Sequence, residues 1–186
     1  MAHGGAHLGG VRFWSGLRYR EMAIMIPFVK HPAREGPMVF SCQMFADDVR
    51  PVVLGNSFYG LRKHLADIEW EGVSYRAHHR GEVVFQCTGG LPDRWSRCVG
   101  NADRGLRWLR GTFALPILGL RPSGQYVSSG FHWDFDQAQA CPIETQLSWC
   151  PAGEEPHFHW QSVRDYSFAM RDMGWRTGAP RPLRTE

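Results

Sequence analysis

Short apolar runs separated by glycine, proline, asparagine and aspartate recur along the whole chain, and no long amphipathic helical pattern interrupts them. This pattern is typical of β-rich proteins. Residues 79–82, with the sequence HRGE, predict a hairpin turn in which Gly81 takes the unusual φ. The clearest apolar runs, each expected as a strand, are residues 19–29, 38–45, 51–54, 73–78, 83–87, 111–118, 126–135 and 144–149.

Several of these runs are apolar on both faces. In residues 19–29, Glu21 alternates with apolar residues on its own face, and the opposite face is apolar as well. A strand that is apolar on both faces is buried on both, as in a closed barrel or a covered sheet. Glu21 is then expected on a buried face, where a carboxylate is costly unless it is paired or hydrogen-bonded.

The pattern predicts few helices and one domain. Residues 62–70 and 162–173 have apolar residues at helical spacing, whereas residues 92–110 predict a loop with one helical turn. We find no linker that would divide the chain, so we expect a single domain over residues 1–186. Residues 1–10 are expected as a flexible leader and residues 174–186 as an extended tail.

Composition excludes several classes of protein. No stretch is long and apolar enough for a membrane span, and no secretory signal is visible, so we expect a cytoplasmic protein. The five cysteines contain no CxxC pair, which leaves a disulfide framework or a four-cysteine zinc site unsupported. The net charge of +3 is mild and dispersed, so neither a nucleic acid nor a membrane is expected as a partner. Nucleotide-binding and hydrolase motifs do not occur, and we expect no cofactor.

Lysine is scarce in the chain. Only Lys30 and Lys63 are lysines, so 21 − 2 = 19 of the basic residues are arginine. An ordinary amine, with a pKa of about 10.4, is almost wholly protonated at pH 7 and cannot attack a carbonyl. Burial or a neighbouring cation frees the nucleophile. Lys63 lies between Arg62 and His64, beside apolar residues, but a solvated surface lysine explains the same local sequence.

The segments YREMAIMIPFV, from Tyr19, and GNSFYGLRKHLADI, from Gly55, resemble the central part of the acetoacetate decarboxylase-like family. The glycines and small residues around the lysine fall where the signature of that family places them. The resemblance implies a β-rich α+β fold, in which an antiparallel sheet curls into a barrel with a few short helices. It also implies that Lys63 forms a Schiff base and that Glu21 is the acid/base carboxylate. Substrate-binding residues are expected at Tyr19, Tyr59, Arg62 and His64.

The chain departs from the family at three places. Arg62 replaces the usual proline, His64 replaces the second lysine of the decarboxylases, and Asn56 replaces an arginine. A further departure is at the N-terminus, where the family portion that carries a substrate-gripping arginine has no match, unless Arg12, Arg18 or Arg20 substitutes.

Two functions therefore stay open. The first is a lyase-type enzyme that uses Lys63 on a small keto acid or ketone, by decarboxylation or by aldol and dehydration chemistry. The second is a non-catalytic protein of the same fold that binds or senses a small molecule. The family also implies a homo-oligomer, which a monodisperse monomer in light scattering would contradict.

A metal site is the main competing interpretation. His157 and His159 lie on one side of an extended chain, and His132, Asp134 or Glu155 would supply a third ligand. No fixed metal-binding signature accompanies these residues, so we expect no metal.

Overall fold

The computed structural model of the 186-residue chain describes the backbone of residues 3–8, 11–17, 19–90, 94–98, 103–150, 158–161 and 168–184. Side chains are described over the same ranges, except for residues 3–17, 160 and 161. The chain forms two compact units. Unit 1 contains Met1–Leu65, Gly111–Trp133 and Gly174–Glu186, and unit 2 contains Ala66–Arg110 and Asp134–Met173.

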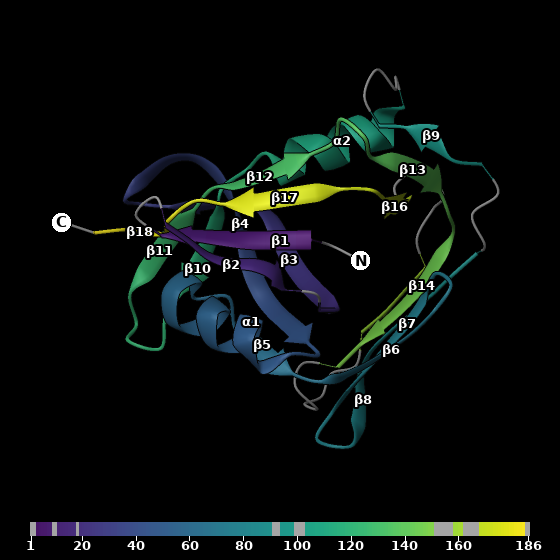
Figure 1. Cartoon of the computed structure of the whole chain (residues 1–186), viewed down its shortest axis with the longest axis horizontal. Coiled ribbons are helices and arrows are strands. Elements are labelled where there is room, and N and C mark those ends of the chain that lie inside the picture. Colours follow the sequence, from purple (N-terminus) through teal and green to yellow (C-terminus); the bar gives the residue numbers. More distant parts are fainter. Residues whose placement is uncertain are drawn as a thin grey trace. The chain divides into compact units, whose positions relative to one another are not determined.

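The larger sheet of unit 1 is built on the two longest described strands, β3 and β4, which form an antiparallel pair (Figure 1). The opposite edge of β4 binds β10 near its middle and β5 near its end, both in parallel. The sheet order is β18-β11-β10-β4-β3, with β5 beside β4. The strands are β3 (Glu21–His31), β4 (Arg34–Ala46), β5 (Lys63–Leu65), β10 (Ile117–Leu120), β11 (Tyr126–Ser129) and β18 (Arg181–Pro182).

Unit 1 also contains a short helical segment and a second sheet. Between β4 and β5 the chain forms α1 (Val49–Leu54), which continues directly into a turn of π-helix, η1 (Gly55–Tyr59). The second sheet has the order β12-β17-β1-β2. Its strands are β1 (His3–Leu8), β2 (Val11–Leu17), β12 (Phe131–Asp134) and β17 (Gly174–Thr177). Residues expected as a leader and as a tail thus contribute β1 and β17, which pair in parallel.

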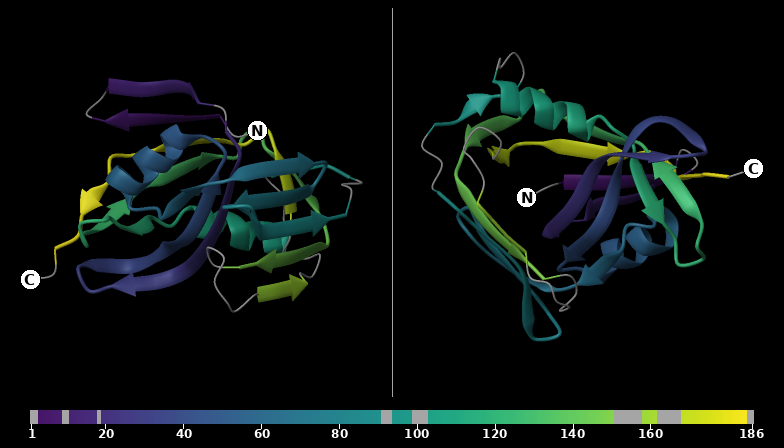
Figure 2. Two further views of the ribbon diagram at one scale, coloured as in Figure 1. Left: turned by 90° about the horizontal axis from the view of Figure 1, so that it is seen from below. Right: turned by 180° about the vertical axis from the view of Figure 1, so that it is seen from behind.

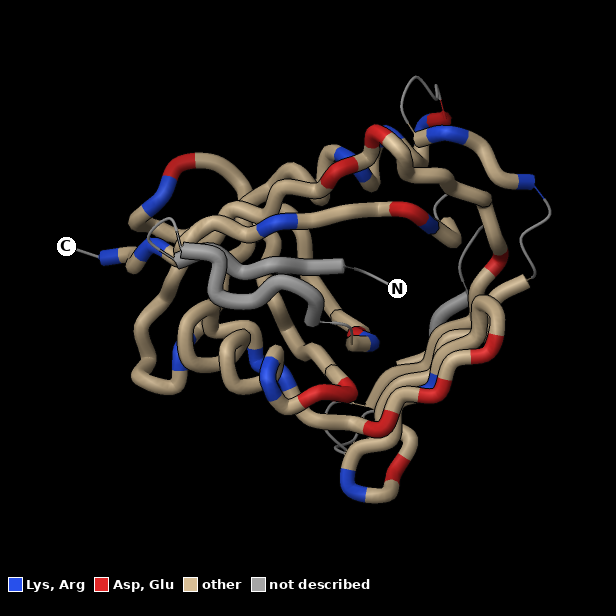
Figure 3. Tube along the Cα trace, viewed as in Figure 1, with Lys and Arg blue, Asp and Glu red and all other residues tan. Residues whose placement is uncertain are grey.

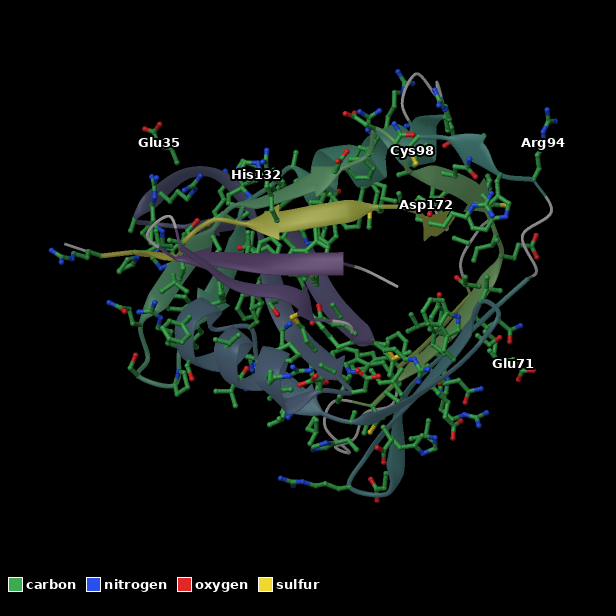
Figure 4. The ribbon with its side chains drawn as sticks, in the orientation of Figure 1. Glu35, Glu71, Arg94, Cys98, His132 and Asp172 are labelled. Atoms are coloured by element: carbon green, nitrogen blue, oxygen red, sulfur yellow. The ribbon has the colours of Figure 1, made fainter. Side chains whose placement is uncertain are left out.

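Unit 2 contains a five-stranded sheet, a three-stranded sheet and a helix. The five-stranded sheet has the order β15-β14-β8-β7-β6, and its hairpin strands are visible beside β14 in Figure 2. Helix α2 covers a core that includes Cys98, which Figure 4 labels, and Leu106. Both residues are almost fully buried. The elements are β6 (Asp67–Glu71), β7 (Ser74–His79), β8 (Glu82–Gly89), β9 (Ser96–Arg97), α2 (Arg104–Phe113), β13 (Gln139–Pro142), β14 (Thr145–Trp149), β15 (Phe158–Gln161) and β16 (Phe168–Arg171).

The general fold class expected from the sequence, β-rich α+β, is confirmed. The described chain is a β-rich α+β protein with a few short helices, but its strands form four sheets, and no closed barrel is found among those the structure describes. The sheets are also not wholly antiparallel, because β4 pairs in parallel with both β5 and β10.

Several element predictions are confirmed and others are wrong. The hairpin turn between β7 and β8 is confirmed, because Arg80 and Gly81 both have positive φ, as a two-residue turn requires. Residues 51–54, expected as a strand, belong to α1, because the Asp48 carboxylate accepts the Arg50 N–H and caps a helix there. Residues 62–70, expected as a helix, form β5 and β6, because strand pairing overrides their helical spacing.

Two more helix predictions need correction. Within the expected helix 162–173, residues 168–171 form β16, and residues 162–167 lie outside the described part. Residues 92–110, expected as a loop with one helical turn, contain most of the ten-residue helix α2.

Candidate active site

The pairing of three strands places Glu21 and Lys63 on one face of a sheet. In the β3–β4 register Glu21 lies opposite Ala46, and in the β4–β5 register Lys63 lies opposite Met44. Met44 and Ala46 are two residues apart on β4, so their side chains leave the same face. The side chains of Glu21 and Lys63 therefore project to that face from the two strands that flank β4. There the Lys63 Nζ donates a hydrogen bond to Glu21 Oε2 and forms an ion pair with it.

The lysine end of this ion pair is shielded from water, whereas Glu21, which was expected on a buried face, is among the exposed residues of β3. Only 5% of the Lys63 side chain and 27% of the Glu21 side chain are exposed. The Lys63 Nζ also lies 5.4 Å from the centroid of the Tyr19 ring, within range of a cation–π interaction. A buried ammonium is tolerated only when it is paired and hydrogen-bonded, and Glu21 and Tyr19 supply that environment.

Tyr19 adds a neutral hydrogen-bond donor to the pair. Burial raises the pKa of Tyr19 far above its ordinary value, and the neighbouring Glu21 carboxylate raises it further through its charge and its hydrogen bond to the phenol. The negative charge of Asp48 acts in the same direction. Tyr19 thus remains a phenol that donates to Glu21, so that Glu21 accepts from both Tyr19 and Lys63.

Backbone contacts fix the start of β3 against the end of β4. The Arg20 N–H donates to Asp47 Oδ1 at 2.8 Å, and the Asp47 N–H donates to the Arg20 carbonyl at 3.3 Å. This reciprocal pair holds the residues on either side of Arg20, which are Tyr19 and Glu21. The strand ends therefore position two of the three site side chains.

Asn56 holds the backbone of Lys63 from both sides. Its Nδ2 donates to the Lys63 carbonyl at 2.8 Å, and its Oδ1 accepts the Lys63 N–H at 2.6 Å. The amide thus binds both polar groups of the Lys63 backbone, much as a neighbouring strand would. Sequence reasoning noted Asn56 only as a departure from the family signature and missed this contact. No sequence signal points to this contact, because it depends on the π-helical turn, which brings residues seven positions apart together.

Gly55 provides the space for the Lys63 side chain. A Cβ at residue 55 would lie 2.7 Å from Lys63 Cδ and 2.8 Å from Cε. The aliphatic part of Lys63 therefore packs directly on the backbone where α1 becomes η1.

Two further glycines allow the chain to turn from η1 towards β5. Gly60 has a φ of +63°, and a Cβ there would lie 2.6 Å from the Leu120 backbone. A Cβ at Gly119 would lie 1.9 Å from the Tyr59 carbonyl. The buried Ser41 hydroxyl donates to the Leu61 carbonyl at 2.9 Å, which satisfies this backbone beside the turn.

An apolar cluster lies beside the ion pair. It includes Met44, the β4 residue opposite Lys63, and partly buried hydrophobic residues pack against it. The buried members are Met44, Tyr59, Leu61 and Ile117, and the partly buried ones are Met25 and Phe131. The Lys63 side chain thus has a carboxylate and a phenol at its tip, and its strand borders an apolar cluster.

The other three expected substrate-binding residues lie elsewhere. Tyr59 is a buried member of the apolar cluster, with its hydroxyl hydrogen-bonded to Thr177, and burial raises its pKa. Arg62 is exposed. His64 packs on Phe45, its partner across the β4–β5 register, on the face opposite Lys63. The structure thus brings together Tyr19, Glu21 and Lys63, and the substrate-binding roles remain predictions.

The competing metal interpretation gains nothing from the described residues. No group of three or more His, Cys, Asp and Glu side chains that could hold a metal ion occurs among them. His132 and Asp134 are exposed on β12, and Figure 4 labels His132. His157 and Glu155 lie outside the described residues.

Comparison with known proteins supports the fold. A crystal structure of acetoacetate decarboxylase from Legionella pneumophila subsp. pneumophila str. Philadelphia 1 matches the chain with a TM-score of 0.57 and 14% sequence identity. The match covers 89% of this chain and 67% of the decarboxylase. The chain has an acetoacetate decarboxylase-like fold. No protein-family model matches the chain, and no curated protein sequence matches it. Any activity therefore has to be argued from the residues of this chain.

Among the described residues, no helix is long and apolar enough to cross a membrane.

Proposed function

We propose that this protein is a lyase-type enzyme in which Lys63 forms a Schiff base with a small ketone or keto acid. The observation that carries the proposal is the ion pair between the buried Lys63 and Glu21 in a chain with an acetoacetate decarboxylase-like fold. Lys63 is the amine nucleophile, and Glu21 is the acid/base group. No cofactor is needed, because the iminium itself withdraws electrons from the neighbouring carbon.

The pair has the groups that imine formation requires. Lys63 must lose a proton before it attacks a carbonyl carbon, and Glu21 Oε2 already accepts a hydrogen bond from that ammonium. The same proton can then be returned to the carbinolamine oxygen, which leaves as water. Tyr19 donates to Glu21 throughout and keeps the carboxylate in place. Among the expected substrate-binding residues, the geometry therefore favours Tyr19 over Tyr59, Arg62 and His64.

A second function is favoured by the burial of the same pair. A lysine side chain that is only 5% exposed and bound to a carboxylate also suits a permanent ion pair. In that case the protein would be a non-catalytic member of the fold that binds a small molecule. For either function we also propose that the protein assembles into a homo-oligomer.

Borohydride trapping tests the proposal. The protein is incubated with acetoacetate, pyruvate or acetylacetone, reduced, digested and examined by peptide mass spectrometry. We expect an adduct on Lys63 and none on Lys30, which is exposed on β3 and serves as the internal control. A Lys63→Met variant should lose the adduct, whereas a Lys30→Met variant should keep it.

Labelling of neither lysine, with the protein folded by circular dichroism, would contradict the enzyme proposal. Ligand binding that persists in the folded Lys63→Met variant would then favour the non-catalytic function.

A further inference from the structure

The polar groups of the Lys63 backbone point away from the strand with which β5 pairs. In parallel pairing, a residue bonds to the two neighbours of the residue opposite it, and the Met44 N–H accordingly donates to the Arg62 carbonyl at 3.2 Å. The N–H and carbonyl of Lys63 itself are therefore directed away from β4. Strand β5 has three residues, and β4 is its only strand partner among those the structure describes. Lys63 thus needs another partner for its backbone.

Asn56 is that partner, and it acts together with Gly55. The Asn56 amide accepts the Lys63 N–H at 2.6 Å and donates to the Lys63 carbonyl at 2.8 Å. Because Lys63 is only 7% exposed, both backbone groups would be costly if they were left unpaired. The side chain of Lys63 packs on the backbone at Gly55, the preceding residue. Two consecutive residues of η1 therefore fix the backbone and the side chain of Lys63.

The residue before Lys63 has a strained backbone. Arg62 has a φ of +46°, in the left-handed region, where a residue with a Cβ is strained. Figure 3 colours the consecutive basic residues Arg62 and Lys63 blue. A proline, whose φ is fixed at about −65°, could not take this conformation. Asn56 and Arg62, two of the departures from the family signature, thus both act on the position of Lys63.

Several contacts around Arg62 hold this conformation. The Leu61 N–H donates to the Gly55 carbonyl at 3.1 Å, and the Ser41 hydroxyl donates to the Leu61 carbonyl at 2.9 Å. A strained residue persists only where its surroundings determine its conformation. These bonds hold the residue before Arg62, and the Asn56 amide holds the residue after it.

The π-helical turn that carries Asn56 is itself anchored. Arg121, in the turn between β10 and β11, donates from Nε and Nη2 to the Phe58 carbonyl at 3.0 and 2.9 Å. Its Nη1 donates to Gln125 Oε1 at 2.8 Å. The turn that presents the amide to Lys63 is therefore bound to the large sheet of unit 1 through the β10–β11 connection.

We propose that Asn56 is a positioning residue for the reaction of Lys63, and that it is needed because Arg62 leads into β5 in a strained conformation. This inference rests on the proposed Schiff-base function and extends it to a residue that acts through the Lys63 backbone. Without the amide, Arg62 relaxes towards a negative φ and the Lys63 backbone turns with it. The ammonium then moves away from Glu21 Oε2, the atom that accepts its proton.

The test measures how fast Lys63 reacts. Wild type and Asn56→Ala are incubated with increasing acetylacetone in the presence of borohydride, and the adduct on Lys63 is quantified by peptide mass spectrometry. The maximal rate should fall at least about tenfold, because misplaced reacting groups lose factors of this size. The half-saturating concentration should change little. Raising the pH should not restore the rate, since the amine is misplaced rather than protonated.

Two further variants separate positioning from a loss of stability. Asp103→Ala is the matched control, because Asp103 Oδ1 accepts the Leu106 N–H at 2.8 Å at the start of α2, a bond of the same kind in unit 2. It should lower the free energy of unfolding and leave the maximal rate of the folded protein unchanged. Asn56→Asp has nearly the same shape as wild type but sets an oxygen against the Lys63 carbonyl, so its maximal rate should also fall at every pH.

The link to Arg62 is tested by glycine and alanine at that position. Both substitutions remove the guanidinium, so any role of that group cancels in the comparison, but only glycine takes a positive φ without strain. In the Asn56→Ala background, Arg62→Gly should therefore label at least about threefold faster than Arg62→Ala. With Asn56 in place the two should label at similar rates, because the amide holds either backbone.

The outcomes separate the two proposals. A wild-type maximal rate in folded Asn56→Ala or Asn56→Asp, or a rate that recovers at high pH, would overturn the positioning role and leave the Schiff-base function standing. Equal labelling of the two double variants would overturn the link to Arg62. Absence of any adduct on Lys63 in the wild type would overturn the Schiff-base function itself.

Discussion

At the scale of single residues, Glu21 is the centre of the site. It accepts hydrogen bonds from the Lys63 ammonium and from the Tyr19 phenol, so two donors hold one carboxylate. The two donors differ in whether they can release a proton. Lys63 can give up a proton during the reaction, whereas the raised pKa of Tyr19 keeps its proton in place. In the proposed function, Glu21 therefore keeps one hydrogen-bond donor, Tyr19, while it takes the proton of the other, Lys63.

Replacing Tyr19 with phenylalanine should change the stability of the protein in alkali. Because the folded pKa of Tyr19 is raised above the unfolded value of about 10, the folded state keeps a proton that the unfolded state loses. Stability therefore falls as the pH rises above about 10, by up to about 1.4 kcal/mol per pH unit for this one group.

Tyr19→Phe removes this contribution, so its free energy of unfolding should fall less steeply above pH 10 than that of the wild type. Urea unfolding between pH 7 and 11 measures the difference. The two curves should run parallel below pH 9. Parallel curves up to pH 11 would show that Tyr19 is not shielded as described.

How far the sequence predicts this site differs from residue to residue. Tyr19, Glu21 and Lys63 were all expected in the site, and β3–β4–β5 pairing brings them together. His64 was expected there because it follows Lys63, but successive residues of a strand point to opposite faces. Asn56 could not be assigned a role, because its contact with Lys63 depends on a π-helical turn that no apolar spacing predicts.

At the scale of elements, the junction of α1 and η1 determines where Lys63 can lie. The junction has no side chain at Gly55, and the Lys63 side chain packs on its backbone. Gly55 has helical dihedral angles, so its conformation alone does not require glycine. Glycine is required at residue 55 because the Lys63 side chain approaches its backbone so closely.

Gly55→Ala should therefore damage the site more than the fold. The added Cβ would displace the Lys63 side chain from Glu21, and we expect borohydride labelling of Lys63 to fall about tenfold, with a loss of stability of about 1 to 3 kcal/mol from overpacking.

Gly111→Ala is the matched control for this variant. Gly111 lies in α2, and a Cβ there would have nothing within 4 Å. This control should gain about 0.5 to 1 kcal/mol and label normally. Normal labelling of Lys63 in Gly55→Ala would show that the Lys63 site does not depend on a glycine at residue 55.

Predictability also varies among the elements. The long strands and the β7–β8 hairpin follow from apolar runs and turn chemistry, which are local signals. The extended structure of residues 62–70 does not follow from local signals. Strand β5 is only three residues long, and its extended form depends on pairing with β4, which lies elsewhere in the sequence. Helix α1 was missed because its last four residues, which begin with a proline, read as a short apolar run.

At the scale of the whole molecule, the two compact units interleave along the chain. Unit 1 takes its residues from three segments, and unit 2 takes its residues from the two segments between them. The large sheet of unit 1 needs all three of its segments, since β4, β10 and β18 come from different ones. In unit 2, β8 and β14 come from different segments and pair with each other. Neither unit can therefore form from one continuous piece of chain.

We expect this connectivity to make unfolding a single transition. If unit 2 unfolded alone, both of its segments would stay tied at their two ends to a folded unit 1, and such closed loops gain less entropy than free chain. If unit 1 unfolded alone, the segment that joins the two parts of unit 2 would be tied in the same way. Helix α2 also contributes residues to both units, so unfolding of either one would break it.

Hydrogen exchange followed by mass spectrometry in increasing denaturant tests this expectation. Peptides from β4 report on unit 1 and peptides from β8 report on unit 2. Both should lose protection at the same denaturant concentration, in a two-state manner. Loss of protection in β8 while β4 stays protected would mean that each unit has a stability of its own. The Lys63 site, whose described side chains all lie in unit 1, could then remain intact after unit 2 has unfolded.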